Sequence, residues 1–169
     1  LLPEILPPIA DKLFFPKPMR WGYNSRRFAR PVRWMTALFG AEILDIEFAG
    51  IGAARSSRGH RLLGSDDIPI PEPKDYLQLL RENYVICDQE ERRALIWRQI
   101  LDEAERLGGE VRPDEELLTE VTFLLEYPTA LSGRFEEQYL TLPEELVITP
   151  MREHQRYFPV YAADGKLLP

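Results

Sequence analysis

The stretch from residue 88 to residue 109 constrains the fold most, because both of its ends carry helix signals. Asp88 is a good N-cap, and Glu91 follows three residues later, as in a capping box. Apolar residues then recur on one helical face: Ile96, Ile100, Ala104 and Leu107. Gly108 and Gly109 end the pattern. The sequence therefore predicts a helix through Leu107, and we expect it to pack on a sheet containing Leu44, Ile46 and Phe48.

Shorter patterns around this helix mix strands with further helices. Before it we expect strands at residues 28–39, 44–48 and 53–58, helices at 8–14 and 75–83, and a turn at Gly40-Ala41. After it we expect a helix capped by Asp114, a helix opened by Pro143, and a strand at 157–161. Because the elements do not alternate strictly, the pattern predicts one α+β domain over residues 1–169, with helices on a mainly antiparallel sheet.

Charge is distributed unevenly along the chain. The net charge is −7, yet residues 1–61 hold 10 Lys and Arg against 5 Asp and Glu, whereas residues 62–169 hold 11 against 23. No apolar run approaches about 20 residues, so we expect no membrane span. The single cysteine, Cys87, excludes an internal disulfide and a cysteine-rich zinc site, and the two histidines give no metal-ligand pattern. These features favour a cytoplasmic protein.

A basic stretch rich in aromatic residues lies near the N-terminus. It has seven basic residues and no acidic one: Lys12, Lys17, Arg20, Arg26, Arg27, Arg30 and Arg33. Interleaved with them are Met19, Trp21, Tyr23, Phe28 and Trp34. Arginine binds phosphate through a planar fork and aromatic rings stack on bases, so the stretch favours nucleic-acid binding. The alternative is that Trp21, Phe28 and Trp34 are core residues and the arginines pair with acids of the second half.

A second basic group follows in Arg55, Arg58, His60 and Arg61. Gly59 before the histidine would allow close approach to a ligand, although a solvated loop explains the same residues. The surrounding GHRLLG lacks the lysine of a phosphate loop, so we expect no ATP site in this chain.

The segment MREHQRYF, residues 151–158, is dense in groups that hydrogen-bond or stack. Glu153 beside His154 suggests a general base for hydrolysis. Adjacent residues of a strand point to opposite faces, however, and neither serine nor cysteine lies nearby. We therefore expect no catalytic residues and interpret the segment as a polar lock or an RNA contact.

Five motifs occur in the order found in one known family. They are KPMRWG (17–22), FARPVRW (28–34), GHRLLG (59–64), LLTEVTFLLEYPTALSGRF (117–135) and MREHQRYFPV (151–160). Together they resemble the beta subunit of the bacterial heterotetrameric glycine–tRNA ligase. Leu62 stands where that family usually has phenylalanine. The resemblance implies a fragment from the N-terminal half of such a subunit, so we expect residues 165–169 to be weakly packed.

The resemblance also implies a division of labour. The alpha subunit of an alpha2beta2 assembly would carry adenylate chemistry with ATP and magnesium, while the beta subunit binds tRNA(Gly). The fold would be similar to the editing-type module of the phenylalanine–tRNA ligase beta chain. We expect this fragment to be non-catalytic and to bind or position tRNA; the alternatives are an aminoacyl-tRNA deacylase or a scaffold docking the alpha subunit. The expected tRNA contacts, on one face, are Lys17, Arg20, Arg30, Arg33, Arg58, His60, Arg61, His154 and Arg156.

Overall fold

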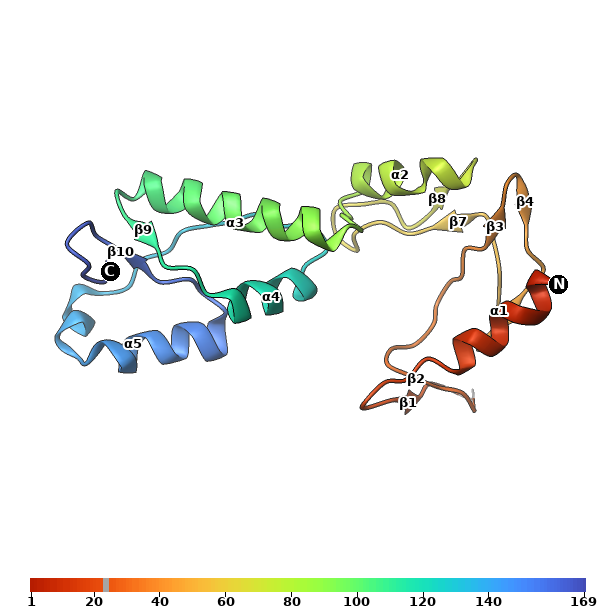
Figure 1. The fold of residues 1–169 in the computed structure, drawn as a ribbon, viewed down its shortest axis with the longest axis horizontal. Coiled ribbons are helices and arrows are strands. Elements are labelled where there is room, and N and C mark those ends of the chain that lie inside the picture. The colour runs from red at the N-terminus through yellow and green to blue at the C-terminus, as the bar shows by residue number, and fades with distance from the viewer. Residues whose placement is uncertain (23–24) are drawn as a thin grey trace. The chain divides into compact units, whose positions relative to one another are not determined.

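A computed structural model describes residues 1–22 and 25–169, which form two compact units, Leu1–Val85 and Ile86–Pro169 (Figure 1). Helices and short antiparallel strands are mixed in both units, which confirms the α+β class. The named strands form two-stranded ladders instead of one larger sheet. The single domain over residues 1–169 and the likeness to an editing module stay predictions. None of the helices in the described ranges is long and apolar enough to cross a membrane.

Within its described residues, the first unit combines two helices, a 3-10 turn and four strand pairs. Its elements in chain order are α1 (Leu2–Asp11), β1 (Met19–Arg20), β2 (Arg27–Phe28), β3 (Leu38–Phe39), β4 (Glu42–Ile43), β5 (Glu47–Phe48), β6 (Ile51–Gly52), β7 (Ser56–Ser57), β8 (Ile68–Pro69), η1 (Pro73–Asp75) and α2 (Tyr76–Glu82). Each strand pairs antiparallel with the next: β1 with β2, β3 with β4, β5 with β6 and β7 with β8. A small core forms around Ile68, Ile70 and Leu80.

The strands expected in the first unit are shorter than predicted: of residues 44–48 only Glu47–Phe48 (β5) is a strand, and of residues 53–58 only Ser56–Ser57 (β7). The strand predicted over residues 28–39 pairs only near its ends, because Pro31 has no N–H to donate to a ladder. The helix predicted from Pro8 instead begins at Leu2 and runs through Pro7 and Pro8, whose fixed φ suits a helix. The predicted turn at Gly40-Ala41 is confirmed, with a φ of +57° at the glycine.

The second unit is built around its longest helix. Its elements are α3 (Gln89–Arg106), β9 (Glu110–Val111), α4 (Glu115–Leu124), η2 (Glu137–Thr141), α5 (Glu144–Pro150), the π-helical turn η3 (Met151–Gln155) and β10 (Val160–Tyr161). Helix α3 packs on α4 and β9. The residues on which we expected α3 to pack, Leu44, Ile46 and Phe48, belong to the first unit, so that packing stays a prediction.

The predicted ends of α3 are confirmed. The Asp88 carboxylate accepts hydrogen bonds from the backbone N–H groups of Glu90 and Glu91, at 2.8 and 3.1 Å. At the other end Gly108 has a φ of +71°, and the Gly109 N–H donates to the Ala104 carbonyl at 2.9 Å. Local capping therefore sets both boundaries of this helix.

The C-terminal segment folds back as a hairpin. Gly165, with a φ of +82°, makes a turn, and its N–H donates to the Ala162 carbonyl at 2.8 Å. The Leu168 N–H donates to the Val160 carbonyl at 2.8 Å, and Leu167 is buried. The expectation of a weakly packed end is therefore wrong, because the turn returns the chain to β10.

Candidate functional site

The β1–β2 pair places two arginines directly opposite each other. Arg20 is the cross-strand partner of Arg27, and Met19 is that of Phe28. Both arginine side chains are exposed, and neither has an ion pair or hydrogen bond with another described residue. Like charges directly opposite in a ladder destabilise it. The pair therefore costs stability in the free chain and would gain from an anion bound over it.

Most other basic side chains of this stretch are also exposed and form no ion pair within the described ranges. Arg26 is the exception, with a nitrogen 3.2 Å from the Asp11 carboxylate and its guanidinium 4.9 Å from the Phe48 ring centroid. The remaining basic side chains are exposed and have no ion pair within the described ranges: Lys12, Lys17, Arg20, Arg27, Arg30 and Arg33. The first unit therefore presents positive charge to solvent.

The aromatic residues of the stretch divide into packed and exposed ones. Trp21 donates its indole N–H to the Phe28 carbonyl at 3.0 Å, and the Phe28 ring lies 4.6 Å from Phe15 and 5.7 Å from Phe48, centroid to centroid. These two residues fit the core interpretation. Trp34 does not, because 45% of it is exposed. Tyr23 lies outside the described residues.

The GHRLLG turn packs against Asn83. A Cβ on Gly59 would lie 2.7 Å from the Asn83 Cβ, and one on Gly64 would lie 2.5 Å from the Asn83 carbonyl oxygen. We expected Gly59 to let a ligand approach the backbone closely. In the structure the group that lies this close is Asn83 of the same chain. His60 Nδ1 accepts from two backbone N–H groups at 3.3 Å, those of Leu62 and Leu63.

The four residues of the second basic group have different surroundings. Arg55 donates to the backbone carbonyls of Ile70 and Pro71, at 3.2 and 2.7 Å, and also to that of Ala41. It therefore has a structural role. The Arg58 guanidinium lies 5.2 Å from the Trp34 ring centroid, and Arg61 is exposed without a partner in the described part of the chain.

In the second unit, arginines of the MREHQR segment bind carboxylates of α4 and of the residue that caps it, Asp114. Arg152 lies 2.6 Å from Asp114 and 2.7 Å from Glu116, and it also contacts Glu153. Its hydrogen bond is the main cause that lowers the pKa of the Asp114 carboxyl, and the three carboxylates raise the pKa of Arg152. Arg156 pairs with Glu120 at 2.7 Å. This geometry supports the polar lock, while His154 is exposed.

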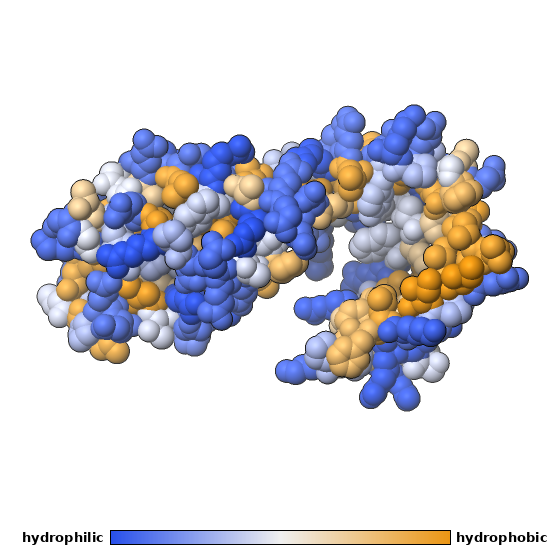
Figure 2. Space-filling view, viewed as in Figure 1, coloured by the Kyte–Doolittle hydropathy of each residue, from blue (hydrophilic) through white to orange (hydrophobic). Residues whose placement is uncertain are grey.

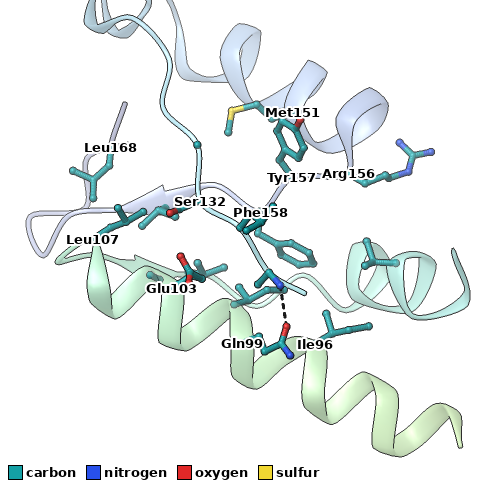
Figure 3. A pocket seen from close by; sticks show the side chains of 18 of the residues that line it. Ile96, Gln99, Glu103, Leu107, Ser132, Met151, Arg156, Tyr157, Phe158 and Leu168 are labelled. Atoms are coloured by element: carbon teal, nitrogen blue, oxygen red, sulfur yellow. Dashed lines mark hydrogen bonds between the residues drawn. The ribbon is translucent and has the colours of Figure 1, made fainter. Parts of the chain in front are cut away.

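A cavity of about 690 Å³ also lies in the second unit (Figure 3). Its walls come from α3, from the extended residues 128–135 and from residues around Phe158. Gln99 on α3 holds the extended segment by accepting from the Ala130 N–H at 2.9 Å, the dashed contact in Figure 3. His154 is not among the lining residues, so the structure does not place the candidate general base in this cavity. Within the described ranges no cluster of His, Cys, Asp and Glu could hold a metal ion.

Comparison with known proteins identifies the family. The family model described as "Glycyl-tRNA synthetase beta subunit" matches residues 1–169. The chain therefore belongs to the glycyl-tRNA synthetase beta subunit family, which confirms the resemblance predicted from its motifs.

Its relatives carry the same name. A protein of Moorella thermoacetica named "Glycine--tRNA ligase beta subunit" is 55% identical over 169 residues, covering 100% of this chain. Proteins of the same name from Desulforamulus reducens and Clostridioides difficile are 51% and 47% identical, over 99% and 100% of the chain. The chain spans 24% of the length of each of these relatives.

Proposed function

We propose that this chain helps a glycine–tRNA ligase to bind and position tRNA(Gly), through exposed cations of its first unit. The observation that carries the proposal is the arginine pair of β1 and β2, Arg20 opposite Arg27, with no carboxylate paired to either within the described residues. The family and the relatives' names supply the anionic partner, because a tRNA is the substrate such a ligase must hold.

The register of β1 and β2 directs this arginine pair away from the packed aromatic rings. Successive side chains of a strand point to opposite faces. Phe28 packs between Phe15 and Phe48, so Arg20 and Arg27 share the other face of the ladder. Two adjacent guanidinium groups on one face suit the closely spaced phosphates of an RNA backbone.

The remaining contacts in the proposal are the expected cations of the first unit. They are Lys17, Arg30, Arg33, Arg58 and Arg61, with His60 beside them in the sequence. His154 and Arg156 of the second unit stay predicted contacts; the pairing of Arg156 with Glu120 gives its guanidinium a structural role as well.

In this proposal the chemical steps of the ligase take place in the alpha subunit and not in this chain. An alpha subunit in a cytoplasmic alpha2beta2 assembly would bind ATP and magnesium and form the adenylate, while this part of the beta subunit is non-catalytic. The deacylase alternative loses support, because His154 is exposed and does not line the cavity.

A scaffold role has one supporting observation. Figure 2 shows apolar residues gathered along α1, where Ile5 and Ile9 are 44% and 54% exposed. These exposed apolar side chains lie on one helix, so this face suits a partner surface such as that of the alpha subunit. We therefore retain docking as the second candidate.

The two steps of the ligase reaction test the first proposal. In the full-length beta subunit assembled with its alpha partner, the double variant Arg20→Gln/Arg27→Gln should lower the rate of glycine transfer to tRNA at subsaturating tRNA. The same variant should leave ATP–pyrophosphate exchange unchanged, since adenylate formation needs no tRNA contact here. Equal loss of both steps would instead indicate damage to assembly, which is the outcome the scaffold candidate predicts.

A further inference from the structure

Trp34 is the exposed tryptophan of a basic segment. It follows Arg33 directly and has 45% of its surface exposed, whereas Trp21 in the same stretch is hydrogen-bonded to Phe28. The part of its indole ring that stays exposed offers a flat apolar surface on which another ring can stack.

The fold places Trp34 beside Arg58. The Ala54 N–H donates to the Met35 carbonyl at 2.9 Å, and the Thr36 hydroxyl donates to the Ser56 carbonyl. These bonds hold the residues after Trp34 against the segment that leads through β7 into Arg58. The guanidinium lies 5.2 Å from the ring centroid, within the range of a cation–π contact. These hydrogen bonds therefore hold together the two segments that carry the pair.

Other cations lie next to this pair in the sequence. Arg33 precedes the tryptophan and Arg61 lies three residues after Arg58; both are exposed and without an ion pair in the part of the chain that the structure describes. A ligand that joins an anionic group to a flat ring could therefore pair its charge with these arginines and stack its ring on Trp34. A nucleotide is the unit that joins a phosphate to such a ring.

We propose that Trp34 and Arg58 form a stacking platform for one unpaired base of the bound tRNA. Unpaired bases are recognised by stacking on aromatic rings and on arginine planes, whereas the bases of a duplex are already stacked on one another. The inference rests on the proposed tRNA binding and adds to it that this part of the surface contacts an unpaired nucleotide rather than a helical stem. Stacking tolerates any base, so the platform selects for single-strandedness and not for sequence.

The experiment compares two RNAs on the full-length beta subunit assembled with its partner. One RNA is tRNA(Gly) and the other is a fully paired duplex with the same number of phosphates. The Trp34→Leu variant should bind the tRNA about 10-fold more weakly, the loss expected when one stacked base is released. Its affinity for the duplex, and the salt dependence of both affinities, should stay as in the unsubstituted protein.

Three further variants separate stacking from folding and charge. Trp34→Phe keeps a ring and should restore most of the tRNA affinity. Arg58→Lys keeps the charge but removes the plane, so it should weaken tRNA binding without changing the salt slope. Phe39→Leu removes another exposed aromatic residue of the first unit, 68% exposed, and should change neither affinity.

The outcomes distinguish failure of the stacking platform from failure of the proposed tRNA binding. Equal loss for tRNA and duplex in Trp34→Leu would overturn the platform, as would unchanged tRNA affinity in both Trp34→Leu and Arg58→Lys. If Arg20→Gln/Arg27→Gln still weakens binding in either case, the proposed tRNA binding stands without the platform. If the unsubstituted protein binds neither RNA in a salt-dependent way, the proposed function fails, and the platform fails with it.

Discussion

Arg152 Nε lies 2.6 Å from Asp114 Oδ2, and the other oxygen of the same carboxylate accepts the Leu117 N–H at 2.9 Å. One carboxylate thus caps α4 and holds the π-helical turn η3, across 38 residues of sequence. The MREHQR motif is in this way fastened to the N-terminal turn of a helix. Its first arginine has a structural role that the nearby sequence does not reveal.

Two substitutions of Asp114 separate its two roles. Asp114→Asn keeps a side-chain oxygen for the cap but loses the charge that pairs with Arg152. Asp114→Ala loses both, so its free energy of unfolding should be lower than that of Asp114→Asn by about 0.5–2 kcal/mol, the usual contribution of an N-cap. Urea unfolding of the three proteins measures the difference. Equal stabilities for the two variants would show that the cap contributes nothing.

Stability should also depend on this carboxyl in acid. The pKa of Asp114 is lowered in the folded chain, chiefly by the hydrogen bond from Arg152. The stability that the ionised Asp114 carboxylate contributes is therefore fully present above its pKa in the unfolded chain, about 3.9. That stability is lost as the pH falls through the lower pKa of the folded chain. Between pH 6 and pH 2 the free energy of unfolding should fall less steeply with decreasing pH in Asp114→Asn than in the unsubstituted protein. Parallel profiles would contradict this assignment.

Arg92 is a buried cation whose removal should destabilise the second unit. It is 8% exposed, donates to the Thr122 carbonyl at 2.8 Å, and also donates to the Ile86 carbonyl. Arg92→Met keeps much of the volume but leaves both acceptors unpaired, at a cost of about 1–3 kcal/mol for each group left unsatisfied. Arg98→Met, on the exposed side of α3, is the matched control and should change stability little. Thermal unfolding would contradict the account if both variants behaved alike.

Gly59 should not accept a larger side chain. The Cβ of Gly59→Ala would meet the Asn83 Cβ and carbonyl oxygen at 2.7 and 2.8 Å, and such overpacking typically costs about 1–3 kcal/mol. Gly52→Ala is the control, because a Cβ there has no neighbour within 4 Å among the described residues. Chemical unfolding of both variants should destabilise only the first. An unaffected Gly59→Ala would mean that the turn moves freely relative to Asn83.

Local signals in the sequence predicted some elements and not others, for a physical reason. Both ends of α3 are encoded within a few residues of each boundary, by Asp88 and by the glycines after Leu107, so the helix could be predicted. The strand expected over residues 28–39 depended on partners far along the chain, which alternation alone does not supply. Short two-residue ladders give too little pattern to predict.

The candidate site shows the same limit. Composition indicated the basic stretch, but the pairing of Arg20 with Arg27 follows from a register that only the fold defines. Trp21 and Trp34 have similar neighbours in sequence, yet one is hydrogen-bonded to the chain and the other is exposed. The signal available beforehand was the family motif around each, which does not distinguish packing from binding.

Salt dependence of tRNA affinity tests the central claim most directly. The Arg20→Gln/Arg27→Gln variant of the full-length, assembled protein should bind tRNA(Gly) more weakly, with the slope of log affinity against log salt reduced by about two units. Its unfolding midpoint should be equal or higher, because a like-charge cross-strand pair has been removed. A control with the same charge change in the second unit, Arg106→Gln/Lys166→Gln, should keep the slope. Unchanged affinity and slope together with lower stability would contradict the account and make these arginines structural.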